Sequence, residues 1–177
     1  MKVEMLIVGR GGQGILLLGR VIGVAASKYA NLYVTSVEAY ASETRGGESR
    51  VDIVISDDPK EIDYVRVVNA DIALFMYPYN LARYSEVLKE DAYVFINSTF
   101  CKEHPYKTQK VFLKPYSEIA EKTAGTSRVA NMVALGHLIA KTRVQRVEHV
   151  EEALKEIISK ELYEVNIKAL RAGLALD

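Results

Sequence analysis

The chain has 177 residues, of which 49% are hydrophobic and 26% charged, and this balance predicts one globular domain, residues 1–177, with a single core. Its 23 basic and 23 acidic residues cancel, so the net charge does not indicate nucleic acid or an anionic membrane as a partner. The N-terminus begins with a strand-like segment instead of a leader peptide, and no apolar stretch approaches about twenty residues. We therefore expect a soluble, cytoplasmic protein.

Cys101 is the only cysteine of the chain. One thiol excludes an internal disulfide, a cysteine-ligated iron–sulfur cluster and a multi-cysteine zinc site built by this chain alone. Neither His104 nor an acid beside it has a spacing that indicates an activated thiol. If the protein takes part in redox chemistry, we expect another chain to carry the electrons.

The first elements in chain order predict a β-α-β unit. Residues 3–8 form a short apolar run that ends at a glycine cluster, as expected for a buried parallel strand. Apolar residues at three- and four-residue spacing between positions 12 and 29 predict a helix packed on a sheet. Residues 33–37, rich in β-branched and aromatic side chains, predict the second strand.

The rest of the chain continues to alternate strands with helices and ends in helices. Residues 38–48 carry several charges and two adjacent glycines, which predicts a loop. The pattern as a whole predicts a Rossmann-like α/β fold: a mainly parallel twisted sheet with helices on both faces and a helical C-terminal region. The further predicted strands are 50–56, 71–76, 91–96 and 111–113, and the further predicted helices are 81–89, 129–141, 147–160 and 161–174.

A glycine fingerprint lies between the first strand and the first helix. Gly9, Gly11 and Gly14 match the G-x-G-x-x-G spacing, with Gly12 and Gln13 between them. Glycine permits a tight turn and lets a phosphate approach free amides at the start of a helix. The motif therefore predicts a phosphate-bearing ligand. The alternative is that these glycines only allow the helix to pack closely on the strand.

An acidic residue that ends the second strand of a dinucleotide-binding domain holds the ribose hydroxyls, and Glu38 is near that position. It follows Gly14 later than is usual, and a charged glycine loop comes next where a helix would normally begin. NAD binding by Glu38 therefore stays an alternative and is not the favoured interpretation.

Residues 40–48 contain Glu43, Arg45, Gly46 and Gly47 in one loop, at the edge of the sheet where such folds bind ligands. The planar guanidinium of Arg45 suits two-point contact with a phosphate or carboxylate. Arg45 could equally pair with Glu43 or with a neighbouring subunit, or the loop could be a turn with solvated charges.

Polar and aromatic residues follow the next two strands, at positions 77–80 and 97–99, and we expect them at the same edge of the sheet. Residues 125–128 precede a helix, and their hydroxyls and free amides could bind an anion or simply cap the helix. Capping is the favoured interpretation, with Ser127 as the expected cap. Asn131, on the first turn of that helix, could direct its amide into the cleft. His137 lies in an apolar helical stretch, which favours a packed, hydrogen-bonded histidine over a catalyst or a metal ligand.

These residues resemble the gamma subunits of 2-oxoacid:ferredoxin oxidoreductases, over nearly the whole chain. Two motifs in the same order and spacing make this resemblance more specific than the glycine fingerprint alone. Ala41-Ser42 departs from the glycine–proline pair that the family has between its tyrosine and glutamate. The matching residues are Gly9-Arg10-Gly11-Gly12-Gln13-Gly14-Ile15 with Gly19, then Tyr40, Glu43, Arg45, Gly46 and Gly47, then Asn131 with Leu135-Gly136.

The resemblance implies oxidative decarboxylation of a 2-oxoacid, of the 2-oxoglutarate or pyruvate type, to an acyl-coenzyme A, with electrons passed to ferredoxin. It implies alpha, beta and possibly delta partner subunits that hold thiamine diphosphate, Mg²⁺ and iron–sulfur clusters, and no catalytic residue in this chain. This chain would supply structure and part of the coenzyme A site, and would be inactive alone. The alternatives are a stand-alone NAD(P)-binding oxidoreductase and a purely structural docking subunit.

Overall fold

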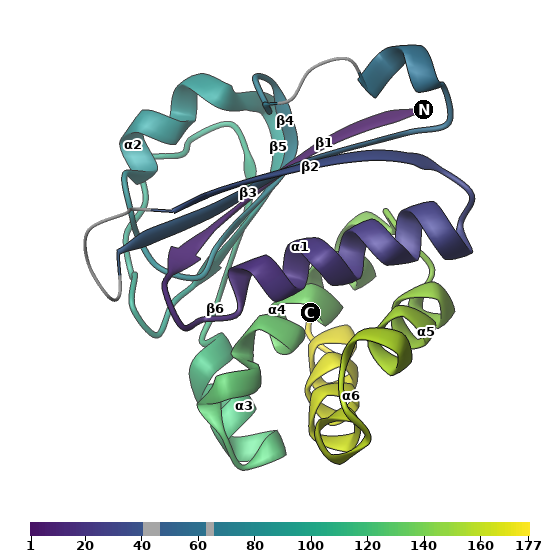
Figure 1. The fold of residues 1–177 in the computed structure, drawn as a ribbon. Helices are drawn as coiled ribbons and strands as arrows, with labels where there is room; N and C mark the ends of the chain where they lie inside the picture. Colours follow the sequence, from purple (N-terminus) through teal and green to yellow (C-terminus); the bar gives the residue numbers. More distant parts are fainter. Residues whose placement is uncertain (41–46, 63–65) are drawn as a thin grey trace.

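The computed structural model describes residues 1–40, 47–62 and 66–177 and contains one six-stranded sheet (Figure 1). The strands lie side by side in the order β2-β3-β1-β4-β5-β6. Their bounds are β1 Lys2–Arg10, β2 Tyr33–Tyr40, β3 Glu48–Ser56, β4 Ala70–Phe75, β5 Leu88–Asn97 and β6 Lys110–Lys114.

All strands except β3 run in one direction. β1, β4, β5 and β6 pair in parallel, whereas β3 pairs antiparallel with both β1 and β2. The chain between β2 and β3 is too short for a crossover connection, which takes about a dozen residues or more, so β3 returns beside β2 as a hairpin partner. β1 and β2 are therefore parallel, as the predicted β-α-β unit requires, but β3 lies between them. The prediction of a mainly parallel sheet is confirmed.

The two layers that cover the sheet are unequal (Figure 1). The larger layer contains α1, α3, α4, α5 and α6, which share a core with one face of the sheet. The other face is covered by the short helix α2 and the segment between β5 and β6, including Cys101 and Tyr106. The helix bounds are α1 Ile15–Val24, α2 Leu81–Tyr84, α3 Tyr116–Ala124, α4 Ala130–Thr142, α5 Val147–Ile157 and α6 Lys160–Leu174.

Some predicted boundaries were wrong because tertiary contacts outweigh local pattern. The helix predicted at 81–89 ends early, since Leu88 pairs with Ala70 and starts β5. Strand β2 continues to Tyr40, through positions predicted as loop. Ser127 does not cap α4: a 3-10 turn, Ser127–Val129, precedes this helix, and Thr126 caps that turn by accepting a hydrogen bond from the Arg128 amide. Within the described residues, no helix has the length and apolar character to cross a bilayer.

Candidate functional site

The segments that follow β1, β4 and β5 meet, together with Gly47 just before β3, at one edge of the sheet, where the carboxyl ends of the parallel strands lie. This is the usual ligand-binding edge of an open α/β sheet. The Met76 amide, just after β4, donates to the Val8 carbonyl of β1, and Asn97, at the end of β5, donates to the Met76 carbonyl. These bonds therefore bring the carboxyl ends of β1, β4 and β5 together, as expected from the sequence.

The glycine loop, residues 9–14, needs glycine for two different reasons. Gly12 and Gly14 have φ angles of 92° and 71°, a backbone conformation that other residues rarely adopt. Gly9 has no positive φ, but a Cβ there would collide with Ile15, on the first turn of α1. Close packing of the helix on the strand is thus part of the explanation. No described residue accepts a hydrogen bond from the amides of Gly12 or Gly14, so both can donate to a ligand.

Gln13 holds the glycine loop in place from within. Its Oε1 accepts a hydrogen bond from the Arg10 amide at 2.7 Å, and its Nε2 donates to the Met76 carbonyl at 3.1 Å. The side chain therefore ties the loop to the end of β4. Both ends of its amide are already used, which favours a positioning role over direct contact with a ligand.

Asn131, on the first turn of α4, also holds the glycine loop through a hydrogen bond. It is 3% exposed, and its Nδ2 donates to the Gly14 carbonyl at 3.2 Å. Its Oδ1 accepts from the Met132 amide at 2.9 Å. A Cβ at Gly14 would collide with this side-chain amide. Asn131 therefore joins α4 to the start of α1, and its amide is not directed into an open cleft as the sequence suggested.

The two glycine motifs of the sequence contact each other. The Gly11 amide donates to the Gly47 carbonyl at 3.0 Å. This bond places the loop after β1 against the beginning of β3. Glu43, Arg45 and Gly46, which the sequence analysis also assigned to the site, lie outside the described residues.

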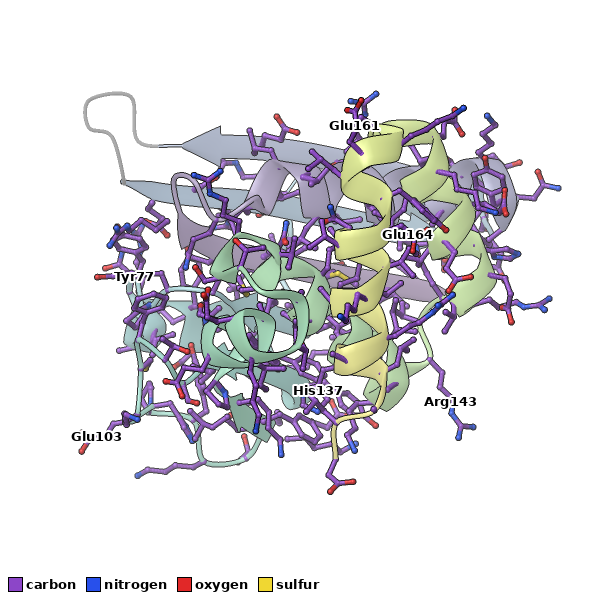
Figure 2. All side chains as sticks on the ribbon, turned by 90° about the horizontal axis from the view of Figure 1, so that it is seen from below. Tyr77, Glu103, His137, Arg143, Glu161 and Glu164 are labelled. Atoms are coloured by element: carbon purple, nitrogen blue, oxygen red, sulfur yellow. The ribbon has the colours of Figure 1, made fainter. Side chains whose placement is uncertain are left out.

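Aromatic side chains form one wall of this edge. The ring of Tyr77 lies 4.9 Å from that of Tyr79 and 5.3 Å from that of Phe100, measured between centroids. The guanidinium of Arg10 lies over the Tyr77 ring at 5.3 Å. Figure 2 shows Tyr77 at the opposite end of the molecule from Arg143. Phe100 is 44% exposed, so this wall faces solvent.

A hollow of about 180 Å³ lies beside the glycine loop and the start of α4. Sequence analysis identified Gly12 and Gln13 but missed Phe100 and Ser117. Their position just after β5 and β6 was the available signal, because strand ends converge at this edge. The described residues that line this hollow include Gly12, Gln13, Phe100, Ser117, Ser127 and Arg128.

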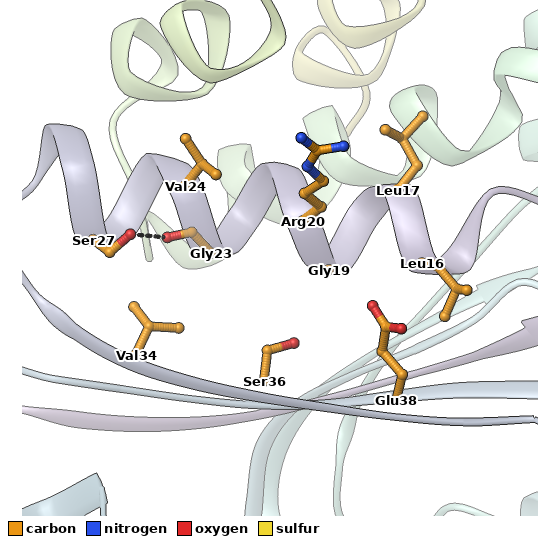
Figure 3. Close-up of a pocket in the computed structure, with 10 residues that line it drawn as sticks. All are labelled: Leu16, Leu17, Gly19, Arg20, Gly23, Val24, Ser27, Val34, Ser36 and Glu38. Carbon is orange, nitrogen blue, oxygen red and sulfur yellow. Dashed lines mark hydrogen bonds between the residues drawn. The ribbon is translucent and has the colours of Figure 1, made fainter. Parts of the chain in front are cut away.

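A larger groove of about 620 Å³ runs between α1 and β2, and Glu38 is part of its lining. Figure 3 shows Glu38 rising from β2 toward α1, beside Leu16. Glu38 lies within the strand, paired with Val51, and does not follow it. Because β3 separates β2 from β1, Glu38 is two strand spacings, about 10 Å, from the strand that carries the glycine loop. This differs from a dinucleotide site, in which the two strands are neighbours.

The buried ionisable groups have structural partners. Burial, together with a hydrogen bond to Glu48, raises the pKa of Tyr84 to about 12. The Cys101 thiol is buried and donates to the Glu103 carbonyl at 2.9 Å. His137 is fully buried and contacts the Tyr116 hydroxyl at 2.8 Å, as a packed histidine should. Among the described residues, no three His, Cys, Asp or Glu side chains are arranged to hold a metal ion.

Known proteins with the same fold and related sequences are subunits of oxidoreductases. The chain is 37% identical to the 2-oxoglutarate synthase subunit KorC of Methanothermobacter marburgensis, over 99% of this chain and 97% of that protein. The gamma subunit of a keto/oxoacid ferredoxin oxidoreductase from Geobacter sulfurreducens superimposes with a TM-score of 0.83 at 29% identity, covering 97% of this chain and 95% of that one.

A further structure shares the fold: the 2-oxoglutarate:ferredoxin oxidoreductase of Magnetococcus marinus, solved with 2-oxoglutarate, coenzyme A and succinyl-CoA bound. The TM-score is 0.85 at 20% identity, over 98% of this chain and 30% of that one. The family model described as pyruvate ferredoxin/flavodoxin oxidoreductase matches residues 4–176. The chain therefore belongs to the pyruvate ferredoxin/flavodoxin oxidoreductase family.

Proposed function

We propose that the chain is the gamma subunit of a complex that oxidatively decarboxylates a 2-oxoacid to an acyl-coenzyme A and reduces ferredoxin. The name of the Methanothermobacter relative favours 2-oxoglutarate as the substrate. Thiamine diphosphate, Mg²⁺ and the iron–sulfur clusters belong, in this proposal, to alpha, beta and possibly delta subunits in the cytoplasm. The single cysteine supports this division, because this chain cannot supply the several thiolates that a cluster requires.

The part of the reaction that we assign to this chain is binding of coenzyme A. The observation that carries the assignment is the hydrogen bond between Gly11 and Gly47, which joins the two glycine motifs at the ligand-binding edge. The amides of Gly12 and Gly14 can donate to a phosphate there, and Arg45 is close along the chain to Gly47. Glu43 and Gly46 belong to the same proposed loop.

The residues of the proposed site divide into two groups by what their side chains contact. Gly12, Gly14 and Arg45 are assigned to the coenzyme itself. The remaining residues keep the glycine loop in its conformation: Gly9 by close packing, Gly11 through Gly47, and Gln13 and Asn131 through backbone carbonyls.

The physical effect of this subunit is positioning. Acyl transfer requires the coenzyme A thiol to reach an acyl group that is held in another subunit. Fixing the phosphates at the edge of the sheet converts an encounter in solution into a step within one complex. No residue of this chain has to donate a proton or an electron for this contribution. We therefore assign no catalytic residue to it and expect the isolated chain to be inactive.

The test is the variant Arg45→Gln in the assembled complex, with Arg143→Gln as the matched control. Arg143 is an exposed arginine at the far end of the molecule from the aromatic wall (Figure 2). Loss of a charge-assisted contact should raise KM for coenzyme A about tenfold or more in Arg45→Gln. KM for the 2-oxoacid should stay unchanged, and Arg143→Gln should match the wild type in both constants.

The alternative of a purely docking subunit gives a different result in the same experiment. If Arg45 only contacts a neighbouring subunit, Arg45→Gln will weaken assembly, measured by size-exclusion chromatography, and complexes that do form will have an unchanged KM for coenzyme A. That outcome would remove the coenzyme A role and leave a structural one. The stand-alone dehydrogenase alternative predicts NAD(P) binding by the isolated chain, which calorimetry can measure.

A further inference from the structure

We infer that the hollow beside the glycine loop receives a phosphate group of coenzyme A and that Arg128 supplies its positive charge. This inference rests on the proposed function and adds to it a second anchoring point, distinct from Arg45. The hollow lies between the β1–α1 turn and the beginning of α4, two segments that are more than a hundred residues apart in the sequence.

The charges around the hollow favour an anion. Arg128 is exposed and forms no ion pair with any residue that the structure describes. Among the described residues that line the hollow there is no aspartate or glutamate. An arginine without a carboxylate partner, facing a concave surface without acidic groups, is suited to bind a phosphate through its planar fork of N–H donors.

Hydroxyl and amide donors surround the same space. The Ser117 oxygen accepts a hydrogen bond from Asn97 Nδ2 at 3.0 Å, and Asn97 is fully buried. Because that bond uses a lone pair of the oxygen, the Ser117 hydroxyl proton stays available to an anion. The amide of Gly12 has no acceptor among the described residues. The hollow thus offers neutral donors as well as the Arg128 cation.

The start of α4 leaves the Arg128 side chain available for a ligand. Thr126 caps the short 3-10 turn Ser127–Val129 that leads into α4, and its hydroxyl accepts the Arg128 amide at 3.2 Å. The cap uses the backbone of Arg128 and places no demand on its guanidinium or on the Ser127 hydroxyl. If Ser127 had been the cap, as the sequence suggested, its oxygen would have been engaged by the helix.

The size and the walls of the hollow fit part of a nucleotide. Its volume of about 180 Å³ is about six times the roughly 30 Å³ that one water molecule occupies in the liquid, which is enough for a phosphate with an adjoining group. Phe100 lines it and lies against Tyr77. An aromatic wall beside a cationic group is a suitable surface for a nucleotide base to stack on.

The test uses the assembled complex with Arg128→Gln, and with Arg128→Lys as a variant that keeps the charge. KM is measured for coenzyme A, for 3′-dephospho-coenzyme A and for the 2-oxoacid. We expect Arg128→Gln to raise KM for coenzyme A about tenfold at unchanged kcat and unchanged KM for the 2-oxoacid, with partial recovery in Arg128→Lys. Arg143→Gln again serves as the control.

The two coenzyme forms identify which phosphate is bound. If Arg128→Gln raises KM for coenzyme A alone, Arg128 binds the 3′-phosphate; if it raises KM equally for both forms, Arg128 binds the diphosphate. An unchanged KM in Arg128→Gln together with an increased one in Arg45→Gln would overturn the inference and keep the proposed function. Unchanged values in both variants would overturn both.

Discussion

The Asn131 side-chain amide donates to the Gly14 carbonyl at 3.2 Å, although the two residues are 117 positions apart in the chain. This bond connects the first turn of α4 to the residue that precedes α1. Gly14 has a positive φ and no room for a side chain against Asn131. The two residues are therefore a matched pair, and the conformation of the glycine loop depends on both of them.

Replacing Asn131 with alanine should affect both stability and coenzyme A binding. The variant loses the bonds to Gly14 and Met132 in a buried site, which should lower the free energy of unfolding by about 1–3 kcal/mol. KM for coenzyme A should rise because the loop is less firmly held. Asn166→Ala is the control, since Asn166 is also buried and donates to a backbone carbonyl, that of Leu162. Denaturation of the complex should show a lower free energy of unfolding for both variants, whereas only Asn131→Ala should raise KM for coenzyme A.

Gly136 and Gly173 allow α4 and α6 to cross with their backbones in contact. A Cβ at Gly136 would collide with the Leu170 carbonyl, and one at Gly173 with the Val133 carbonyl. Gly136→Ala should therefore lower the free energy of unfolding by about 1–3 kcal/mol or more. Gly23→Ala is the matched control, because that Cβ meets no atom within 4 Å, and a helical alanine should stabilise by about 0.5–1 kcal/mol. Equal effects of the two substitutions would contradict the close crossing.

Gln13 provides a test of positioning that leaves the glycines intact. In Gln13→Glu the carboxylate cannot donate to the Met76 carbonyl, and its charge opposes a phosphate at the loop. We expect an increased KM for coenzyme A with little change in KM for the 2-oxoacid. Gln109→Glu is the control: Gln109 also donates to a backbone carbonyl, that of Lys89, at 3.1 Å, but at the opposite edge of the sheet. Similar kinetics in both variants would argue against the role of Gln13.

Much of the fold could be predicted from the sequence, because the hydrophobic periodicity of strands and helices is visible even in short segments. The sheet order was not readable. Strand β3 lies between β1 and β2 and pairs antiparallel with both. The sequence analysis did not predict this pairing, because it assigned residues 38–48 to a loop and expected β1 and β2 to be neighbours. The end of the helix predicted at 81–89 was wrong for a related reason, because pairing of Leu88 with β4 decides it.

The candidate site was found where strand ends converge, but the roles of its polar residues needed the tertiary structure. Polar residues in such motifs are typical ligand contacts. The side-chain amides of Gln13 and Asn131, however, form hydrogen bonds with backbone groups of the protein itself. Phe100 and Ser117 have no motif around them and become part of the hollow only through folding. Local patterns identify donors and acceptors, whereas their partners lie at distant positions that periodicity cannot reveal.

The pH dependence of stability should depend on His137. Burial lowers the pKa of this imidazole to about 4 in the folded chain, from about 6.5. Since the Asp177 carbonyl can only accept, Nε2 carries the proton and donates to it, and Nδ1 accepts from the Tyr116 hydroxyl. A neutral imidazole satisfies both partners.

The sign of the effect follows from proton counting. Between about pH 6.5 and pH 4 the unfolded chain binds a proton at this histidine and the folded chain does not, so stability falls as the pH falls, by up to about 1.4 kcal/mol per pH unit. His137→Gln removes the titrating group, and its unfolding free energy should decrease less over the same interval. His104→Gln is the control, because His104 lies in a loop and its Nδ1 accepts a hydrogen bond from the Tyr106 amide. Urea titrations at several pH values would contradict this assignment if His137→Gln kept the wild-type slope, since the proton uptake would then occur at another group.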